Sequence, residues 1–109
     1  MKFLVTWNIS EDKWIPVLKT FNSMTPAQRQ DAGEGVEIVG RWHDPVARTG
    51  VAIFEARDVK AVQRYALRWN PYMALTIAPV IEDEEAVSVY RARRAIRGMT
   101  VSLPNALGG

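Results

Sequence analysis

The order of the predicted elements constrains this chain more than any single residue does. Periodicity and breaker residues predict a strand over 2–8, helical turns between 10 and 33, strands over 36–43 and 49–56, a helix after Asp58, a strand over 73–81 and a last helix ending at Gly98. Pro16 predicts a kink or a later start for the first helix, and Pro79 predicts an edge strand or a bulge. The two main helices should therefore cover one face of an antiparallel sheet.

The order βαββαβ is that of a ferredoxin-like α+β fold, here followed by a C-terminal helix. We expect residues 1–98 to form a single domain of this kind. Residues 99–109 are apolar but lack periodicity. We expect them to form a tail that is either disordered or docked on a partner chain.

Alternation along the predicted strands divides their side chains between two sheet faces. The set expected beneath the helices is strongly apolar: Phe3, Val5, Trp7, Val36, Ile38, Trp42, Val51, Ile53, Leu75, Ile77 and Ile81. The second set is mixed: Leu4, Thr6, Asn8, Glu37, Val39, Arg41, His43, Ala52, Phe54, Ala74, Thr76 and Val80. A solvent face is usually less apolar than this second set. We therefore expect a homodimer through the helix-free face, the alternative being a monomer with a mixed wet face.

Composition excludes several classes of site and partner. The 109 residues include no cysteine, which excludes disulfides and thiolate chemistry, and no apolar run is long enough for a membrane span or a signal peptide. We expect a cytoplasmic protein with no membrane partner. A net charge of +2 is weak for nucleic-acid binding. The run Gly50-Val51-Ala52-Ile53-Phe54 also lacks the ring platform of RNA-recognition motifs, so we expect no nucleic-acid partner.

One tract, Gly40-Arg41-Trp42-His43-Asp44, holds the one histidine of the chain and suggests a ligand site. His43 is the candidate catalytic acid or base, since imidazole titrates near neutral pH. The candidate ligand-binding residues are Arg41, Trp42, Asp44, Trp69, Asn70 and Tyr72. If the second strand runs antiparallel to the first and third, these residues share one pole of the sheet, and Trp7, Asn8 and Trp14 lie nearer the other. We expect no cofactor and no metal site, because one His beside one Asp is not a ligand set.

A plainer interpretation of the same tract stays open. Trp42 and Trp69 would be core anchors, His43 a satisfied strand-end histidine and Asp44 the start of a turn. With Trp42 on the apolar face, its truncation is expected to cost ~3–5 kcal/mol.

Four segments resemble a known family: Met1-Lys2-Phe3-Leu4-Val5-Thr6-Trp7, Gly35-Val36, Gly40-Arg41-Trp42-His43-Asp44 and Leu67-Arg68-Trp69-Asn70. They are similar to an uncharacterised bacterial family, domain-of-unknown-function family 3303, over roughly residues 1–90. That family resembles a branch of the dimeric α+β barrel superfamily, which includes cofactor-less monooxygenases, muconolactone-isomerase-like enzymes and haem-degrading enzymes. The resemblance implies the fold and the dimer but no assigned reaction.

Three functions follow as hypotheses. The first is a homodimeric α+β barrel protein that binds a small aromatic or acidic organic molecule. The second is a cofactor-less monooxygenase- or isomerase-like enzyme, with His43 as acid or base and Arg41 orienting an anionic substrate. The third is a structural or regulatory partner protein without a ligand. A cavity beside His43 would separate the first two from the third.

Overall fold

The fold is a mixed α+β arrangement, which a computed structural model describes for residues 1–99. The elements in chain order are β1 Lys2–Asn8, α1 Glu11–Ser23, α2 Pro26–Gln30, β2 Val36–Asp44, β3 Thr49–Ala56, α3 Val59–Trp69, β4 Ala74–Val80 and α4 Asp83–Met99. Every predicted strand is present with bounds within one residue of those expected. Most of the expected tail lies outside the described residues. No helix within residues 1–99 is long and apolar enough to cross a bilayer.

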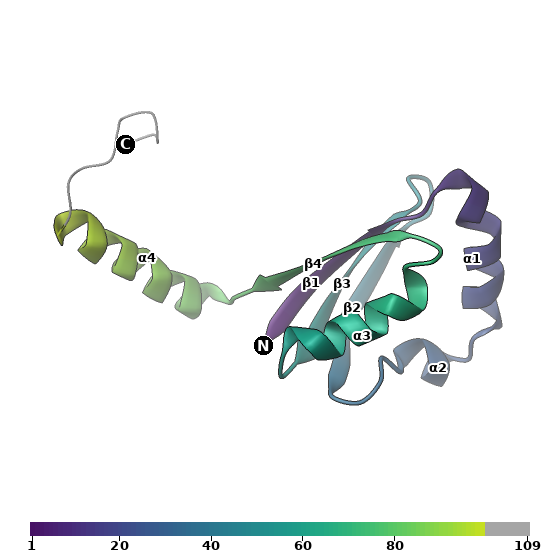
Figure 1. The fold of residues 1–109 in the computed structure, drawn as a ribbon, viewed down its shortest axis with the longest axis horizontal. Helices are drawn as coiled ribbons and strands as arrows, with labels where there is room; N and C mark the ends of the chain where they lie inside the picture. The colour runs from purple at the N-terminus through teal and green to yellow at the C-terminus, as the bar shows by residue number, and fades with distance from the viewer. Residues whose placement is uncertain (100–109) are drawn as a thin grey trace.

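The sheet has four strands in the order β2-β3-β1-β4, and each neighbouring pair is antiparallel. Helices α1 and α3 lie on the same side of this sheet (Figure 1). Because β1 and β2 both run antiparallel to β3, β2 runs in the same direction as β1. The expectation that β2 runs antiparallel to β1 is therefore wrong. Pro79 lies in β4, which is an edge strand as its sequence predicted.

The core lies between the sheet and the helices. Its buried members are Phe3, Val5, Ala32, Ile38, Ala52, Phe54, Ala56 and Val62. Phe3 pairs with Phe54, and Val5 pairs with Ala52, so these side chains share the helix-covered face. The predicted faces of β3 are therefore wrong: Ala52 and Phe54 lie beneath the helices, whereas Val51 and Ile53 lie on the open face. Both sets are apolar, so alternation alone could not distinguish them.

A β-bulge reverses the faces in the second half of β2. Ile38 pairs with Phe54 and Gly40 pairs with Ile53, which leaves Val39 as an extra residue. An inserted residue shifts the two-residue alternation by one. Arg41 and His43 consequently face the helices, and Trp42 faces away from them. Trp42 is 58% exposed, so its predicted burial beneath the helices is wrong.

The helix ends follow local signals, with two departures. Thr25 and Gln28 form a complete capping box at α2, and Asp58 accepts a hydrogen bond from the Ala61 amide at the start of α3. Helix α1 starts at Glu11 and contains Pro16, so the later start is not observed. Helix α4 continues through Gly98 to Met99, whereas Gly98 was expected to end it.

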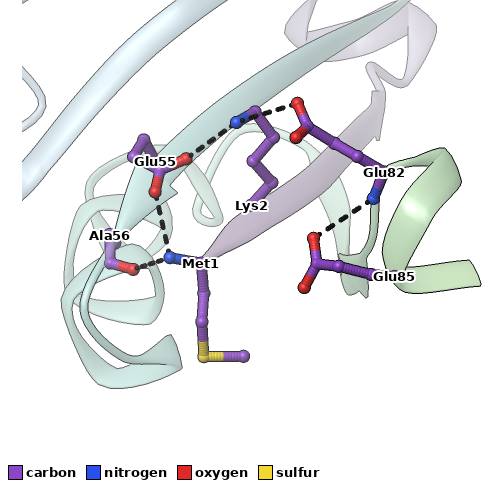
Figure 2. Close-up of polar contacts among 6 residues, drawn as sticks. All are labelled: Met1, Lys2, Glu55, Ala56, Glu82 and Glu85. Atoms are coloured by element: carbon purple, nitrogen blue, oxygen red, sulfur yellow. Dashed lines mark hydrogen bonds and ion pairs between the residues drawn. The ribbon is translucent and has the colours of Figure 1, made fainter. Parts of the chain in front are cut away.

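Polar contacts tie the start of the chain to its neighbours at the end of the sheet opposite His43 (Figure 2). The N-terminal amine donates to Glu55 Oε1 and to the Ala56 carbonyl, each at 3.0 Å. Lys2 Nζ lies 3.3 Å from Glu55 and 3.4 Å from Glu82. The hydrogen bond with the amine, followed by that with Lys2, lowers the pKa of Glu55. These contacts fix the first strand and the segment from which α4 begins.

Candidate functional site

A cavity of about 240 Å³ lies between the helix-covered face of the sheet and helices α1 and α3. Its aromatic lining is Trp7, Trp14, Phe21, Phe54, Tyr65 and Trp69. Charged or titratable side chains at its wall are Arg41, His43 and Asp44. The cavity exceeds the ~150 Å³ apolar cavity that holds a benzene molecule. Its size and chemistry therefore suit a small organic ligand with an apolar body and a polar end.

Trp7 reaches the cavity wall because the neighbouring strand carries a glycine. Trp7, Gly50 and His43 lie opposite one another on β1, β3 and β2. A Cβ atom at Gly50 would lie 2.0 Å from Trp7 Cζ2, a separation at which atoms overlap. The absence of a side chain at Gly50 thus lets the indole cross β3 and meet the imidazole, whose ring centre is 5.7 Å from it.

Phe21 links helix α1 to the polar wall of the cavity. The guanidinium carbons of Arg29 and Arg41 lie 5.4 and 5.5 Å from the centre of its ring. The His43 ring centre lies 5.2 Å away. Arg41 Nη2 also donates to the Arg29 carbonyl at 2.6 Å, which holds the guanidinium against the ring. Stacking on an aromatic face favours a cation, so Phe21 positions positive charge beside the cavity.

Arg41 carries a positive charge that no acidic group of the described residues neutralises. The ion pairs among residues 1–99 involve Glu55 and Glu82, at the opposite end of the sheet. One arm of the Arg41 guanidinium is used by the Arg29 carbonyl. A guanidinium has further N–H donors in a fixed plane, and these suit a carboxylate or a phenolate.

His43 lies at the wall of the cavity in an environment that favours its neutral form. Burial lowers the pKa of its imidazole below the usual value, and the charge of Arg41 lowers it further. At neutral pH the ring is therefore uncharged. A neutral imidazole has one nitrogen that can accept a proton or a hydrogen bond.

Four of the candidate residues line this one cavity: Arg41, His43, Asp44 and Trp69. Asp44 also accepts a hydrogen bond from the Ala47 amide at 3.1 Å, so it starts the β2–β3 turn as well. The other three candidates lie elsewhere. Trp42 is on the open face, Asn70 lines a groove between α3 and β4, and Tyr72 is 41% exposed and is not part of the lining.

Trp7 and Trp14 belong to the same pole as His43, so their expected placement nearer the other pole is wrong. Asn8, which pairs with Thr49 beside Gly50, lies at this pole too. The error follows from the direction assumed for β2. The position of Phe21 beside Arg41 and His43 was not predicted from the sequence.

The described residues offer no cluster of three or more His, Asp or Glu side chains that could hold a metal ion. The groups at the cavity are thus a guanidinium, an imidazole and a turn-forming carboxylate on an aromatic wall. They can bind an anion and exchange a proton.

Comparison with known families identifies the chain. The sequence profile described as Domain of unknown function (DUF3303) matches residues 1–94. The chain belongs to this family. The DUF3303 match covers all four strands, α1 to α3 and most of α4, and so includes every residue that lines the cavity. No curated protein matches this DUF3303 chain.

Proposed function

We propose that this DUF3303 chain binds a small organic anion with an aromatic or otherwise apolar body. The observation that carries the proposal is the cavity itself, which is lined by six aromatic rings and has Arg41 and His43 at its wall. The apolar body would lie among the rings and its anionic group beside the guanidinium. Burial of apolar area would supply most of the affinity, and Arg41 would set the orientation.

Tryptophan fluorescence tests the proposal with 1-naphthoate as the probe. Three of the four tryptophans, Trp7, Trp14 and Trp69, line the cavity, so binding should change the emission. Leu18→Phe narrows the cavity and should weaken binding. Leu67→Phe makes the same change at a side chain that is 64% exposed and lies outside this cavity, and it should bind as the wild type does. Saturable binding that Leu18→Phe leaves unchanged would contradict the proposed location.

The contribution of Arg41 is tested by comparing two ligands. Arg41→Gln should weaken the binding of 1-naphthoate by ~10-fold or more, since hydrogen bonds to charged groups contribute roughly 1.5–3 kcal/mol. The same substitution should weaken the binding of neutral 1-naphthalenemethanol much less. Arg93→Gln, on α4, is the control with the same loss of charge. Equal losses for both ligands would show that Arg41 does not bind the anionic group.

We further propose that the fold is ferredoxin-like and that two chains join through the open sheet face, as in dimeric α+β barrels. The order β2-β3-β1-β4 with antiparallel neighbours supports the first part. Exposed Val39 and Trp42, at 55% and 58%, beside half-buried Leu4, Val51 and Ile53 support the second. Light scattering should give at least twice the chain mass, and Trp42→Asp should reduce it.

An acid–base enzyme is the second candidate function, and the neutral imidazole of His43 at the cavity wall favours it. In this proposal His43 accepts a proton from a carbon next to a carbonyl group, and Arg41 binds the substrate carboxylate. Phenylpyruvate is a suitable probe, because its methylene protons exchange with deuterium through the enol. Exchange accelerated by the wild type and lost in His43→Gln would support catalysis. Saturable binding of phenylpyruvate without faster deuterium exchange would support the binding function and contradict the catalytic one.

A further inference from the structure

Helix α4 (Asp83–Met99) does not lie on the sheet, unlike α1 and α3. Figure 1 shows it pointing away from the sheet and from α1 and α3. Residues 83–94 are all exposed apart from half-buried Ala86, and Val89 and Tyr90 are 56% and 65% exposed. The Lys2–Glu82 ion pair links β1 to the residue that precedes α4 (Figure 2). Most of the stability of a protein helix comes from packing one of its faces on a neighbour, so the exposure of residues 83–94 favours a partner surface for α4.

The sequence of α4 repeats with the spacing of a coiled-coil seam. Asp83, Val87, Tyr90 and Arg94 are separated by four, three and four residues, the spacing of alternating d and a heptad positions. Two central positions are apolar, and their side chains are exposed: Val87 by 36% and Tyr90 by 65%. The end positions are an acid and a base. This stripe, which we call the α4 seam, is about 16 Å long.

Charges on α4 cannot neutralise one another within the same helix. Asp83, Glu84 and Glu85 occupy its first turn, and Arg91, Arg93 and Arg94 follow. The shortest separation between an acid and an arginine is the six residues from Glu85 to Arg91, whereas intrahelical pairs require three or four. Opposite charges at the two ends of one stripe are instead complementary to a second copy that runs in the opposite direction.

We propose that α4 pairs with α4 of a second copy of this chain, antiparallel and about a two-fold axis. In the register centred between Val87 and Tyr90, Val87 of each copy packs on Tyr90 of the other. Asp83 then lies beside Arg94 of the other copy, and Glu84 lies beside Arg91. Antiparallel coiled coils bring together a with d positions and e with e positions, which is the arrangement of these pairs. The pairing is independent of the ligand cavity, which lies at the other end of the sheet.

Charge reversal tests this pairing, because each copy supplies both members of a pair. Asp83→Arg places two arginines together at both ends of the seam, and Arg94→Asp places two acids there. Each single variant should raise the dissociation constant of the self-associated protein by ~10-fold or more, measured by sedimentation equilibrium. The double variant D83R/R94D restores opposite charges at both ends and should recover most of the wild-type association.

Glu85→Arg is the matched control, since Glu85 is in the same turn but at the heptad position farthest from the seam. It makes the same charge change near the helix start and should leave self-association unchanged. Circular dichroism of each variant checks that α4 stays helical. If the open sheet face also joins copies, the single variants should lose only the part of the self-association that α4 contributes. Single variants that associate like the wild type, or a double variant that remains as weak as the single ones, would overturn the proposal.

Discussion

The indole of Trp7 lies directly across the backbone of Gly50 on the neighbouring strand. A Cβ atom at Gly50 would overlap three ring atoms, at 2.0, 2.3 and 2.8 Å. Trp7 packs against the core and against the His43 ring, so a shift of its indole would disrupt both contacts. We expect Gly50→Ala to lower the free energy of unfolding by about 1–3 kcal/mol, the usual cost of overpacking.

Gly40→Ala is the matched control for this prediction. A Cβ there would also meet an indole, since Trp42 Cη2 would lie 2.4 Å away. However, Trp42 is 58% exposed and can swing into solvent. Gly40→Ala should therefore change the free energy of unfolding by no more than about 0.5 kcal/mol. Urea denaturation of both variants measures the difference, and equal costs would contradict the contrast between the two rings.

Trp42→Ala should have little effect on the stability of a single chain. The ring is exposed on the open face, so the loss expected for a buried aromatic does not apply. Phe54→Ala removes a side chain that is 2% exposed and should cost about 3–5 kcal/mol. Thermal unfolding of the two variants at low protein concentration compares them. A Trp42→Ala loss as large as that of Phe54→Ala would place the ring in the core.

Stability should decrease as the pH falls below the usual histidine pKa of about 6.5. Burial and Arg41 lower the pKa of His43 in the folded chain, so the unfolded chain takes up the proton first. The contribution of neutral His43 to the free energy of unfolding is therefore fully present above the unfolded pKa. This contribution is lost as the pH falls through the lower folded pKa. Urea midpoints at pH 7.5 and 5.5 measure this change.

His43→Gln should remove the dependence over that pH window, because the chain has no other histidine. The imidazole resonance of His43 can also be followed directly by proton NMR. A midpoint at or above 6.5 in the folded protein would contradict the predicted direction.

Arg41→Lys should weaken both the local packing and the binding of 1-naphthoate. The guanidinium of Arg41 lies over Phe21 and donates to the Arg29 carbonyl. An ammonium keeps the charge but cannot present a planar fork while stacking on the ring. The fluorescence titration should therefore give a weaker affinity than the wild type. Arg93→Lys on α4 should leave it unchanged, and an unaltered affinity in Arg41→Lys would mean that charge alone is sufficient.

Strand positions and helix caps were predictable because their signals are local. The capping residues Thr25 and Asp58 and the strand bounds required only neighbouring residues. The faces of β3 were not predictable, since Val51 and Ile53 are as apolar as Ala52 and Phe54. Tertiary contacts with Phe3 and Val5 decide which pair is buried.

The candidate site was predictable in part. His43, Arg41 and Trp69 were expected at one pole and do line one cavity. Trp7 and Trp14 were misplaced because strand direction depends on pairing across the sheet rather than on local sequence. Trp42 was misplaced because nothing but Gly40 hinted at the extra residue in β2.

The bulge at Val39 changes which alternate side chains of β2 face the helices. Before it, the inward side chains complete the core, as Ile38 does. After it, the inward side chains are Arg41 and His43 at the cavity. Loss of one residue at this point would exchange the polar pair with Trp42 without altering any other part of the sequence. A single insertion or deletion in β2 could thus convert the cavity wall between polar and aromatic during evolution, a change that would otherwise require several substitutions.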